Sequence, residues 1–210
     1  MTGPVSGTGS VAGLLLAAGA GSRMGRPKAL VELDGEPLVR RGVRLLEAGG
    51  CRPVVAVLGA AAERVRREVT LEHVVVAEEW ATGMGASLRA GLAALAALPA
   101  TAGACVVALA DQPLVGAESV RRLVAAWAGG ARAAVATYAG APRNPVLLDR
   151  GTWAEVAAAA EGDTGARPWL RAHPEHVTLV PCDDTGSPYD VDTPADLTAL
   201  ARPTPQEESV

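Results

Sequence analysis

Phenylalanine and isoleucine are absent from the sequence, which also has a single lysine, Lys28, and a single asparagine, Asn144. Alanine, by contrast, fills 43 of the 210 positions. A GC-rich coding bias produces this pattern, because it favours codons for alanine, glycine, arginine and proline over those for lysine, asparagine, isoleucine and phenylalanine. The one lysine and the one asparagine that remain under such a bias are therefore candidates for functional residues.

What else the chain lacks argues against several classes of protein. No apolar run reaches the about 18 residues that a membrane span needs, and residues 1–10 have neither the basic nor the apolar region of a signal peptide. Aromatic residues make up only 3% of the chain, its formal net charge is −4, and it has no basic stripe. Neither a membrane nor a nucleic acid is therefore an expected partner.

The three cysteines, Cys51, Cys105 and Cys182, lie far apart and form no C-x-x-C pair. None of their spacings is that of a metal site. An odd number of cysteines without a signal peptide indicates free, buried thiols in a reducing compartment, so we expect a cytoplasmic protein.

The remaining composition is that of a globular protein, with 49% hydrophobic and 20% charged residues. Short runs rich in valine and leucine alternate with alanine-rich helical stretches, which is typical of βαβ crossovers. This alternation predicts an α/β fold class: a Rossmann-like three-layer α/β/α sandwich with a mostly parallel sheet. The predicted strands span residues 11–17, 53–58, 74–77, 105–110, 131–138, 145–148 and 177–181, and the predicted helices span 37–48, 60–68, 84–98, 118–128, 150–160, 166–172 and 193–200.

No linker and no internal repeat interrupts this pattern, so we predict a single domain over residues 11–201. Its first half, residues 11–128, has the regular alternation of a nucleotide-binding fold, and its second half, residues 129–201, is more irregular. Residues 1–10 and 203–210 are expected to be flexible tails. In the last predicted helix, Thr193, Pro194 and Asp196 have the spacing of an N-cap, a first helical residue and a capping-box partner.

A glycine-rich loop follows the first predicted strand and ends at Lys28. Glycines let backbone amides approach phosphate oxygens closely, and such ligands bind in loops at the carboxyl ends of parallel strands. The G-x-G-x-x-G pattern of dinucleotide-binding proteins fails at Met24, and the G-x-x-x-x-G-K-[ST] pattern fails because no hydroxyl residue follows Lys28. What remains is a glycine loop with two cations, Arg23 and Lys28, which suits a triphosphate.

Two aspartates are candidates to hold a metal ion beside this loop. Asp111 directly follows a buried strand, at the carboxyl edge of the predicted sheet, and Asp192 stands just before the last predicted helix. Mg²⁺ usually takes one or two protein carboxylates and completes its shell with phosphate and water. These residues therefore favour a Mg²⁺ site, with Asp190 as an alternative to Asp192 and with helix capping as another role for Asp192.

Six motifs in succession resemble those of a known family. The loop at residues 16–28 reads L-A-A-G-x-x-x-R-M-G-x-x-K, and it resembles the signature of the MobA/MocA-type nucleotidyltransferases, in the form that is similar to molybdenum cofactor cytidylyltransferases. The resemblance continues at residues 83–92, 109–113, 143–146, 162–167 and 190–194, and so spans about residues 11–201. It implies the glycosyltransferase A-like topology of nucleotidyltransferases, and transfer of a cytidylyl group from CTP to the phosphate of molybdenum-loaded molybdopterin, with Mg²⁺ and with release of pyrophosphate.

Individual residues take expected roles from these patterns and from the resemblance. Arg23, Lys28 and Asp111 are the expected catalytic residues, and Asp111 and Asp192 are the expected metal ligands. The expected nucleotide site comprises Leu16, Ala17, Ala18, Gly19, Gly21, Ser22, Arg23, Lys28, Gly83, Ser87 and Gln112, with the Gln112 amide reading the pyrimidine. The second half is expected to receive the acceptor in glycine- and proline-rich turns that carry Arg143, Asn144, Asp163 and Arg167.

The expected chemistry needs no general base, because a phosphate monoester has a second pKa of about 6 and is largely dianionic at neutral pH. Catalysis then consists of positioning and charge neutralisation. Besides CTP and a molybdopterin-type acceptor, a molybdoenzyme client or a maturation chaperone is a candidate partner.

Three rival functions stay open. A nucleotidyltransferase for a sugar phosphate or another small phosphate ester keeps the same fold. An NAD(P)H oxidoreductase is disfavoured by the failed dinucleotide pattern and by residues 57–60, which carry no acid for a ribose hydroxyl. A non-catalytic nucleotide-binding subunit is disfavoured by the presence of both Asp111 and Asp192.

Overall fold

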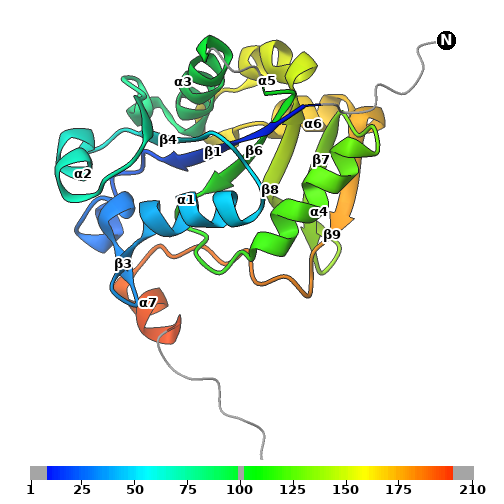
Figure 1. The fold of residues 1–210 in the computed structure, drawn as a ribbon. Coiled ribbons are helices and arrows are strands. Elements are labelled where there is room, and N and C mark those ends of the chain that lie inside the picture. Colours follow the sequence, from blue (N-terminus) through cyan, green and yellow to red (C-terminus); the bar gives the residue numbers. More distant parts are fainter. Residues whose placement is uncertain (1–8, 99–101, 201–210) are drawn as a thin grey trace, which may run out of the picture.

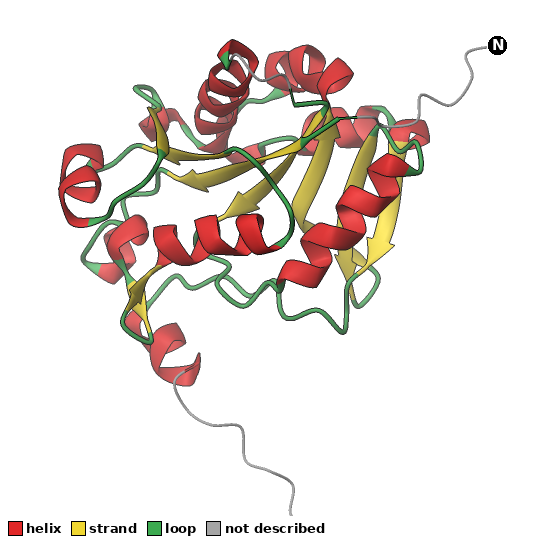
Figure 2. Cartoon of the chain, in the orientation of Figure 1, coloured by secondary structure: helices red, strands yellow, loops and turns green. Residues whose placement is uncertain are grey.

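The computed structural model describes residues 9–98 and 102–200, which form a seven-stranded sheet between two layers of helices (Figures 1 and 2). The sheet order is β5-β4-β1-β6-β8-β7-β9. Strand β8 is antiparallel to both of its neighbours, and the other neighbouring strands are parallel. The strands are β1 (Val11–Ala17), β4 (Val54–Leu58), β5 (His73–Val76), β6 (Ala104–Leu109), β7 (Ala133–Tyr138), β8 (Ala141–Asp149) and β9 (Val177–Pro181).

Three helices cover each face of this sheet. On one face lie α1 (Leu38–Ala48), α2 (Ala62–Glu68) and α4 (Ala117–Ala128), and on the other lie α3 (Met84–Ala97), α5 (Trp153–Ala159) and α6 (Arg167–Ala172). A short ribbon of β2 (Glu32–Leu33) and β3 (Glu36–Pro37) stands apart from the sheet, and the last helix, α7 (Pro194–Leu200), packs against it through Leu197 and Leu200. None of these described helices is long and apolar enough to cross a membrane.

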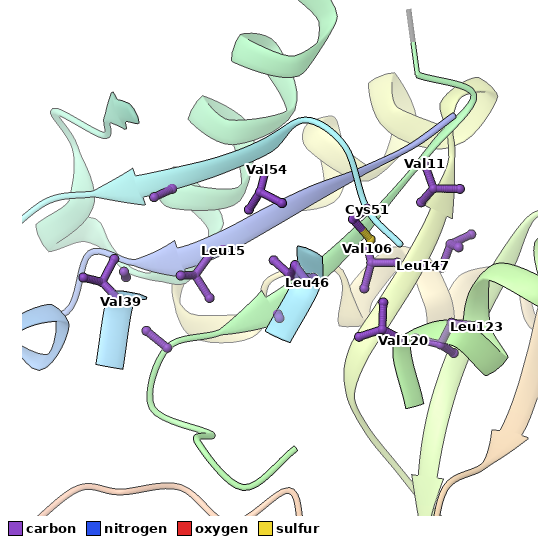
Figure 3. Close-up of a cluster of buried hydrophobic side chains, with 14 of the residues drawn as sticks. Val11, Leu15, Val39, Leu46, Cys51, Val54, Val106, Val120, Leu123 and Leu147 are labelled. Carbon is purple, nitrogen blue, oxygen red and sulfur yellow. The ribbon is translucent and has the colours of Figure 1, made fainter. Parts of the chain in front are cut away.

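The core follows from the alternation of side chains along each buried strand. In β1, Val11 and Leu15 face the layer of α1 and α4, whereas Leu14 and Leu16 face the layer of α3. Figure 3 shows the cluster of buried side chains between the sheet and the layer of α1 and α4, where Leu15 of β1 lies near Val39 and Leu46 of α1. Helix α1 can approach β1 this closely because Gly42 carries no side chain: a Cβ atom there would lie 2.5 Å from Cδ1 of Leu15.

These elements confirm the predicted α/β sandwich and its mostly parallel sheet. Strands β1 and β9 span the predicted residues, and most other elements begin and end within two residues of the prediction. The predicted capping box is also present, since Asp196 accepts a hydrogen bond from the Thr193 amide at 2.7 Å and its own amide donates to Thr193 Oγ1 at 3.3 Å. The three cysteines are free and buried, as expected.

Strand β8 differs from its prediction and corrects the expected position of two residues. Arg143 and Asn144 lie inside this strand, not in a turn. The turn of the β7–β8 hairpin comes earlier, at Ala139 and Gly140, which both have positive φ angles of 48° and 72°. The pairing register shifts farther from the turn, because Val135 pairs with Val146 whereas Ala136 pairs with Arg143, which leaves Asn144 and Pro145 between the two pairs. A proline is tolerated at such an irregularity because its missing N–H leaves no ladder bond unmade.

Both predicted halves of the chain contribute strands to the one sheet, because β1, β4, β5 and β6 precede residue 129 and β7, β8 and β9 follow it. The predicted tails lie outside the described residues, except for Gly9 and Ser10. The β2–β3 ribbon was not predicted, although its turn, Asp34-Gly35, is a common hairpin signal.

The position of β1 inside the sheet, between β4 and β6, predicts that two leucine-to-alanine substitutions have unequal effects on stability. Leu14→Ala should lower the free energy of unfolding by about 2–5 kcal/mol, because Leu14 is fully buried. Leu179→Ala on the edge strand β9 should change it by no more than about 0.5 kcal/mol, because this side chain is 53% exposed. Urea unfolding of both variants measures the difference, and equal losses would contradict the described core.

Candidate active site

A cavity of about 260 Å³ opens at the carboxyl ends of β1 and β6. These strands are parallel neighbours, so their last residues and the loops that follow them meet at one edge of the sheet. Seven of the residues expected to bind a nucleotide line this cavity, together with the expected catalytic residue Asp111: Leu16, Ala17, Ala18, Gly19, Lys28, Gly83 and Ser87.

The glycine-rich loop folds back on itself beside the cavity. Gly21 has a φ of 62°, a left-handed conformation that favours glycine, and its carbonyl accepts a hydrogen bond from the Met24 amide at 2.9 Å. The Lys28 amide donates to the Gly19 carbonyl at 3.3 Å, which closes the loop. In the described part of the chain, the amides of Ala20 and Gly21 donate no backbone hydrogen bond, so they are available to an anion.

Closure of the loop brings Lys28 between two aspartates. Its ammonium group donates to Oδ2 of Asp111 at 2.6 Å and to Oδ1 of Asp192 at 2.5 Å. Arg23 reaches the other oxygen of Asp192 at 3.3 Å from a side chain that is 71% exposed. The expected catalytic residues and both expected metal ligands are thus in one group of contacts. Of this group only Lys28 and Asp111 line the cavity, and the loop residues Gly21, Ser22 and Arg23 do not.

Charge stabilises this group. Burial by itself lowers the pKa of Lys28, but the contacts with Asp111 and Asp192 outweigh it, so this pKa lies above its ordinary value. The hydrogen bond from Lys28 holds the pKa of Asp192 below its ordinary value, although partial burial opposes this shift. Lys28 and Asp192 are therefore both ionised at neutral pH.

The structure separates the two aspartates that the sequence left as alternatives. Asp192 contacts Lys28 and Arg23, whereas Asp190 accepts a hydrogen bond from the Gln112 side chain at 2.8 Å. Gln112 is only 5% exposed and does not line the cavity. Gln112 was expected to bind the base through its side-chain amide. This amide instead donates to Asp190 and to the Pro188 carbonyl, which argues against direct contact with a base.

The opposite wall of the cavity is built at the start of α3. Gly83 has a φ of 119° and lies against the backbone of Gly162, which a side chain would strike. The Met84 amide donates to Oδ1 of Asp163 at 3.3 Å, so this aspartate, expected at the acceptor, lies instead on the wall of the first cavity. Trp80 completes the wall, and its side chain packs against Gly59, where a Cβ atom would lie 2.6 Å from the Trp80 ring.

A second cavity, of about 520 Å³, lies between α6 and the strands β7, β8 and β9. Two residues expected to bind the acceptor, Arg143 and Arg167, line it together with Arg171. Its other walls are apolar and include Leu170 and Leu179. Asn144, also expected at the acceptor, lines neither cavity.

The aspartate pair fits a divalent cation by the chemistry of its donors. Asp111 and Asp192 already converge on one positively charged group, the ammonium of Lys28. Within residues 9–98 and 102–200, no three His, Cys, Asp or Glu side chains are grouped so that they could hold a metal by themselves. Two carboxylates leave the rest of the shell to phosphate and water, which is the arrangement that Mg²⁺ favours and Zn²⁺ does not.

Some lining residues carry no clear signal in the sequence. Ala81, Met84, Leu109 and Ala110 line the first cavity, and they are apolar residues of a kind that also fills the core. Met84, Leu109 and Ala110 stand inside two of the six motifs, but nothing in their residue types distinguishes a cavity wall from a packed core.

Comparison with known proteins matches residues 13–177 of the chain to the MobA-like NTP transferase domain. Nicotine blue oxidoreductase of Paenarthrobacter nicotinovorans is 42% identical over 193 residues, which are 87% of this chain and 92% of that protein. A probable molybdenum cofactor guanylyltransferase of Opitutus terrae is 36% identical over 128 residues, which are 60% of this chain and 55% of that protein.

Among solved structures, that of Rv0371c from Mycobacterium tuberculosis H37Rv is similar with a TM-score of 0.74 at 30% identity, covering 91% of this chain and 97% of that one. A complex of the same protein with manganese gives a TM-score of 0.70 at 29% identity, with the same coverage. The predicted fold class is confirmed by this likeness and by the sheet order.

The contact at Gly83 predicts a measurable difference between two glycines of positive φ. Gly83→Ala should lower the free energy of unfolding by about 1–3 kcal/mol more than Gly25→Ala, because an added Cβ strikes the Gly162 backbone at the first position and meets nothing within 4 Å at the second. Both substitutions place an alanine at a positive φ, but Gly83 (φ 119°, ψ 178°) lies in a region that is almost exclusive to glycine, whereas Gly25 (φ 69°, ψ 5°) is left-handed. Backbone strain and the contact therefore both make Gly83→Ala the more costly change, and urea unfolding of the two variants measures the difference. Equal losses of stability in the two variants would contradict the close contact between the backbones of Gly83 and Gly162.

Proposed function

The chain belongs to the MobA-like NTP transferase family, and we propose that it transfers a cytidylyl group from CTP to the phosphate of a molybdopterin-type acceptor. The observation that carries this proposal is the group formed by Lys28, Asp111 and Asp192 at the mouth of a cavity beside a glycine loop. Such a group unites a phosphate-binding cation with two carboxylates, which is what transfer of a nucleotidyl group requires.

In the proposed reaction an oxygen of the acceptor phosphate attacks the α-phosphorus of CTP. The new P–O bond forms as the bond between the α-phosphorus and its bridging oxygen breaks, and pyrophosphate leaves with that oxygen. The attacking monoester is already largely dianionic at neutral pH, because its second pKa is about 6. No side chain has to remove a proton, so the chain's task is to position and neutralise charge.

The glycine loop supplies the groups that hold the triphosphate. Lys28 lines the cavity, and the same loop carries the free amides of Ala20 and Gly21 and the cation of Arg23. Lys28 has three N–H donors, two of which are used by the aspartates, so one donor remains for a phosphate oxygen. Arg23 is 71% exposed and contacts Asp192, and its guanidinium is proposed to pair with the leaving pyrophosphate.

Asp111 and Asp192 are the residues that would hold Mg²⁺, which when bound neutralises charge on the phosphates. The manganese complex of Rv0371c, a protein 29% identical to this chain, supports a divalent cation in the family. The base is proposed to lie against Ala17 and Ala18, where small side chains leave the cavity open. The choice of CTP over GTP is supported by the Leu-Ala-Ala-Gly form of the loop.

The acceptor is proposed to enter from the second cavity. Arg143 and Arg167 line it, and Asp163 on the wall of the first cavity is only four residues from Arg167 in the chain. Arginine forks bind phosphate oxygens well, and the apolar walls suit the ring system of a pterin. A molybdoenzyme or its maturation chaperone would then receive the product, and the proposal places the protein in the cytoplasm.

Oxidoreduction is a second candidate function, favoured by the 42% identity to nicotine blue oxidoreductase. The residues of this chain give it less support. The loop has Met24 where a dinucleotide fold has its third glycine, and β4 ends at Leu58 with Gly59 and Ala60 following, so no acid is present for a ribose hydroxyl.

A pyrophosphate assay tests the proposal. We expect release with CTP, Mg²⁺ and molybdenum-loaded molybdopterin, less with GTP, ATP or UTP, and none in the Asp111→Asn variant, which has lost one of the two expected metal ligands. Asp34→Asn is the matched control, since Asp34 is exposed, has a positive φ that asparagine accepts, and lies outside the site. Oxidation of NAD(P)H by a quinone-like dye without any pyrophosphate release would contradict the proposal and favour the second candidate. Release with a sugar phosphate instead of molybdopterin would keep the reaction and change the acceptor.

The position of Lys28 predicts how nucleotide binding and turnover change together. Lys28→Ala should raise the KM for CTP about tenfold and lower kcat about a hundredfold, because the cation serves both the ground state and the developing charge. Arg26→Ala is the control on the same loop, since Arg26 contacts neither aspartate in the described structure. Steady-state kinetics of both variants measure these changes. Near-normal KM and kcat values for Lys28→Ala would show that Lys28 has a structural role only.

A further inference from the structure

A segment near the end of the described chain, residues 186–192, lies along residues 111–115 and is called the strap below. Gly186 forms a β-bridge with Val115, and the Ser187 amide donates to the Leu114 carbonyl at 3.0 Å. The Val191 amide donates to the Asp111 carbonyl at 2.8 Å, and the Val191 side chain is fully buried. The strap is thus fixed at both ends to the residues that follow β6.

Gln112 supplies the bonds between these two ends. Its side-chain amide donates one hydrogen bond to the Pro188 carbonyl at 3.2 Å and another to Oδ1 of Asp190 at 2.8 Å. Gln112 is only 5% exposed, so its side chain is held in place by the surrounding structure. Both N–H groups of the amide are used, and the side chain lines a cavity with Arg41 that differs from the one between β1, β6 and α3.

We infer that Gln112 is a positioning residue, which ties the strap so that Asp192 faces Lys28 and Asp111. An extended chain advances at most about 3.6 Å per residue, so fixing Asp190 keeps the Cα atom of Asp192 within about 7 Å of it. The carboxylate of Asp192 needs this restraint because it meets Lys28 and Arg23 from the residue that precedes the helix cap Thr193, not from a strand of the sheet. This role rests on the proposed function only for its effect on catalysis.

Gln112 therefore acts on the reaction through Asp192 and does not touch the base. Its loss should weaken metal-dependent turnover and leave the preference among the four nucleotides unchanged. A residue that reads the base would produce the reverse, a changed preference with an unaltered strap.

The test uses Gln112→Met, which keeps the size of the side chain and removes both hydrogen bonds, alone and combined with Asp190→Ala. Hydrogen–deuterium exchange measures the strap directly, and Mn²⁺ binding in the presence of CTP, followed by electron paramagnetic resonance, measures the metal site. We expect exchange of the peptide covering residues 186–192 to rise about tenfold in Gln112→Met, the size expected for loss of a hydrogen bond to a charged group. Mn²⁺ affinity and kcat should fall by a similar factor, with little change in the KM for CTP.

The matched variants separate the tether from a general loss of stability. Asp190→Asn keeps an oxygen that accepts from Gln112 but loses the charge, so the exchange of its strap should lie between that of the wild type and that of Gln112→Met. The double variant should be no worse than Gln112→Met alone, because both changes remove the same bond.

Unchanged exchange in Gln112→Met would overturn the inference, and so would losses that add in the double variant. A wild-type protein that binds no Mn²⁺ with CTP, but whose strap loosens as described, would contradict the proposed function and leave the tether standing. A changed ratio of kcat/KM between CTP and GTP in Gln112→Met with an unchanged strap would make Gln112 a base reader.

Discussion

The contact of the Lys28 ammonium with Asp111 and Asp192 is the interaction on which the candidate site depends. It joins residues that lie 83 and 164 positions apart in the chain. Each residue is carried by a different segment: Lys28 lies on the glycine loop after β1, Asp111 follows the end of β6, and Asp192 lies on the strap before α7. The parallel pairing of β1 with β6 brings Lys28 and Asp111 together, because loops that follow neighbouring parallel strands leave the sheet at the same edge.

The charges of this group explain why a lysine suits the position better than an arginine. An ammonium is a compact charge with three donors, so it can serve two carboxylates and still face a phosphate. A guanidinium is a larger planar fork whose paired donors suit bidentate contact with a carboxylate or a phosphate. Arg23 takes that second role at the rim, where it is 71% exposed and contacts only Asp192. The single lysine of an arginine-rich chain thus lies where its shape is needed.

The sequence was sufficient for the parts of the structure that depend on local patterns. The continuous apolar run of β1 ends at glycines, and its predicted bounds were correct. The glycine loop and Asp111 could be assigned to one edge of the sheet because each directly follows a buried strand and parallel strands end at the same edge. Arg143 and Asn144 were assigned to a turn because a proline follows them, but the hairpin turns four residues earlier at Ala139 and Gly140. Gln112 was assigned to the base because it stands beside Asp111. Its partners, Pro188 and Asp190, are 76 and 78 residues away, and contacts at that separation leave no trace in a local pattern.

The central claim is that Asp111 and Asp192 hold one divalent cation against a nucleoside triphosphate whose base lies at Ala17 and Ala18. A crystal structure of the protein with CTP and Mn²⁺, with the anomalous signal of manganese recorded, tests this most directly. We expect a single manganese peak beside the two aspartates and the phosphates, with Lys28 turned toward a phosphate oxygen and the cytosine in the cavity between β1 and α3. A manganese ion bound elsewhere, or a triphosphate bound away from the glycine loop, would contradict it.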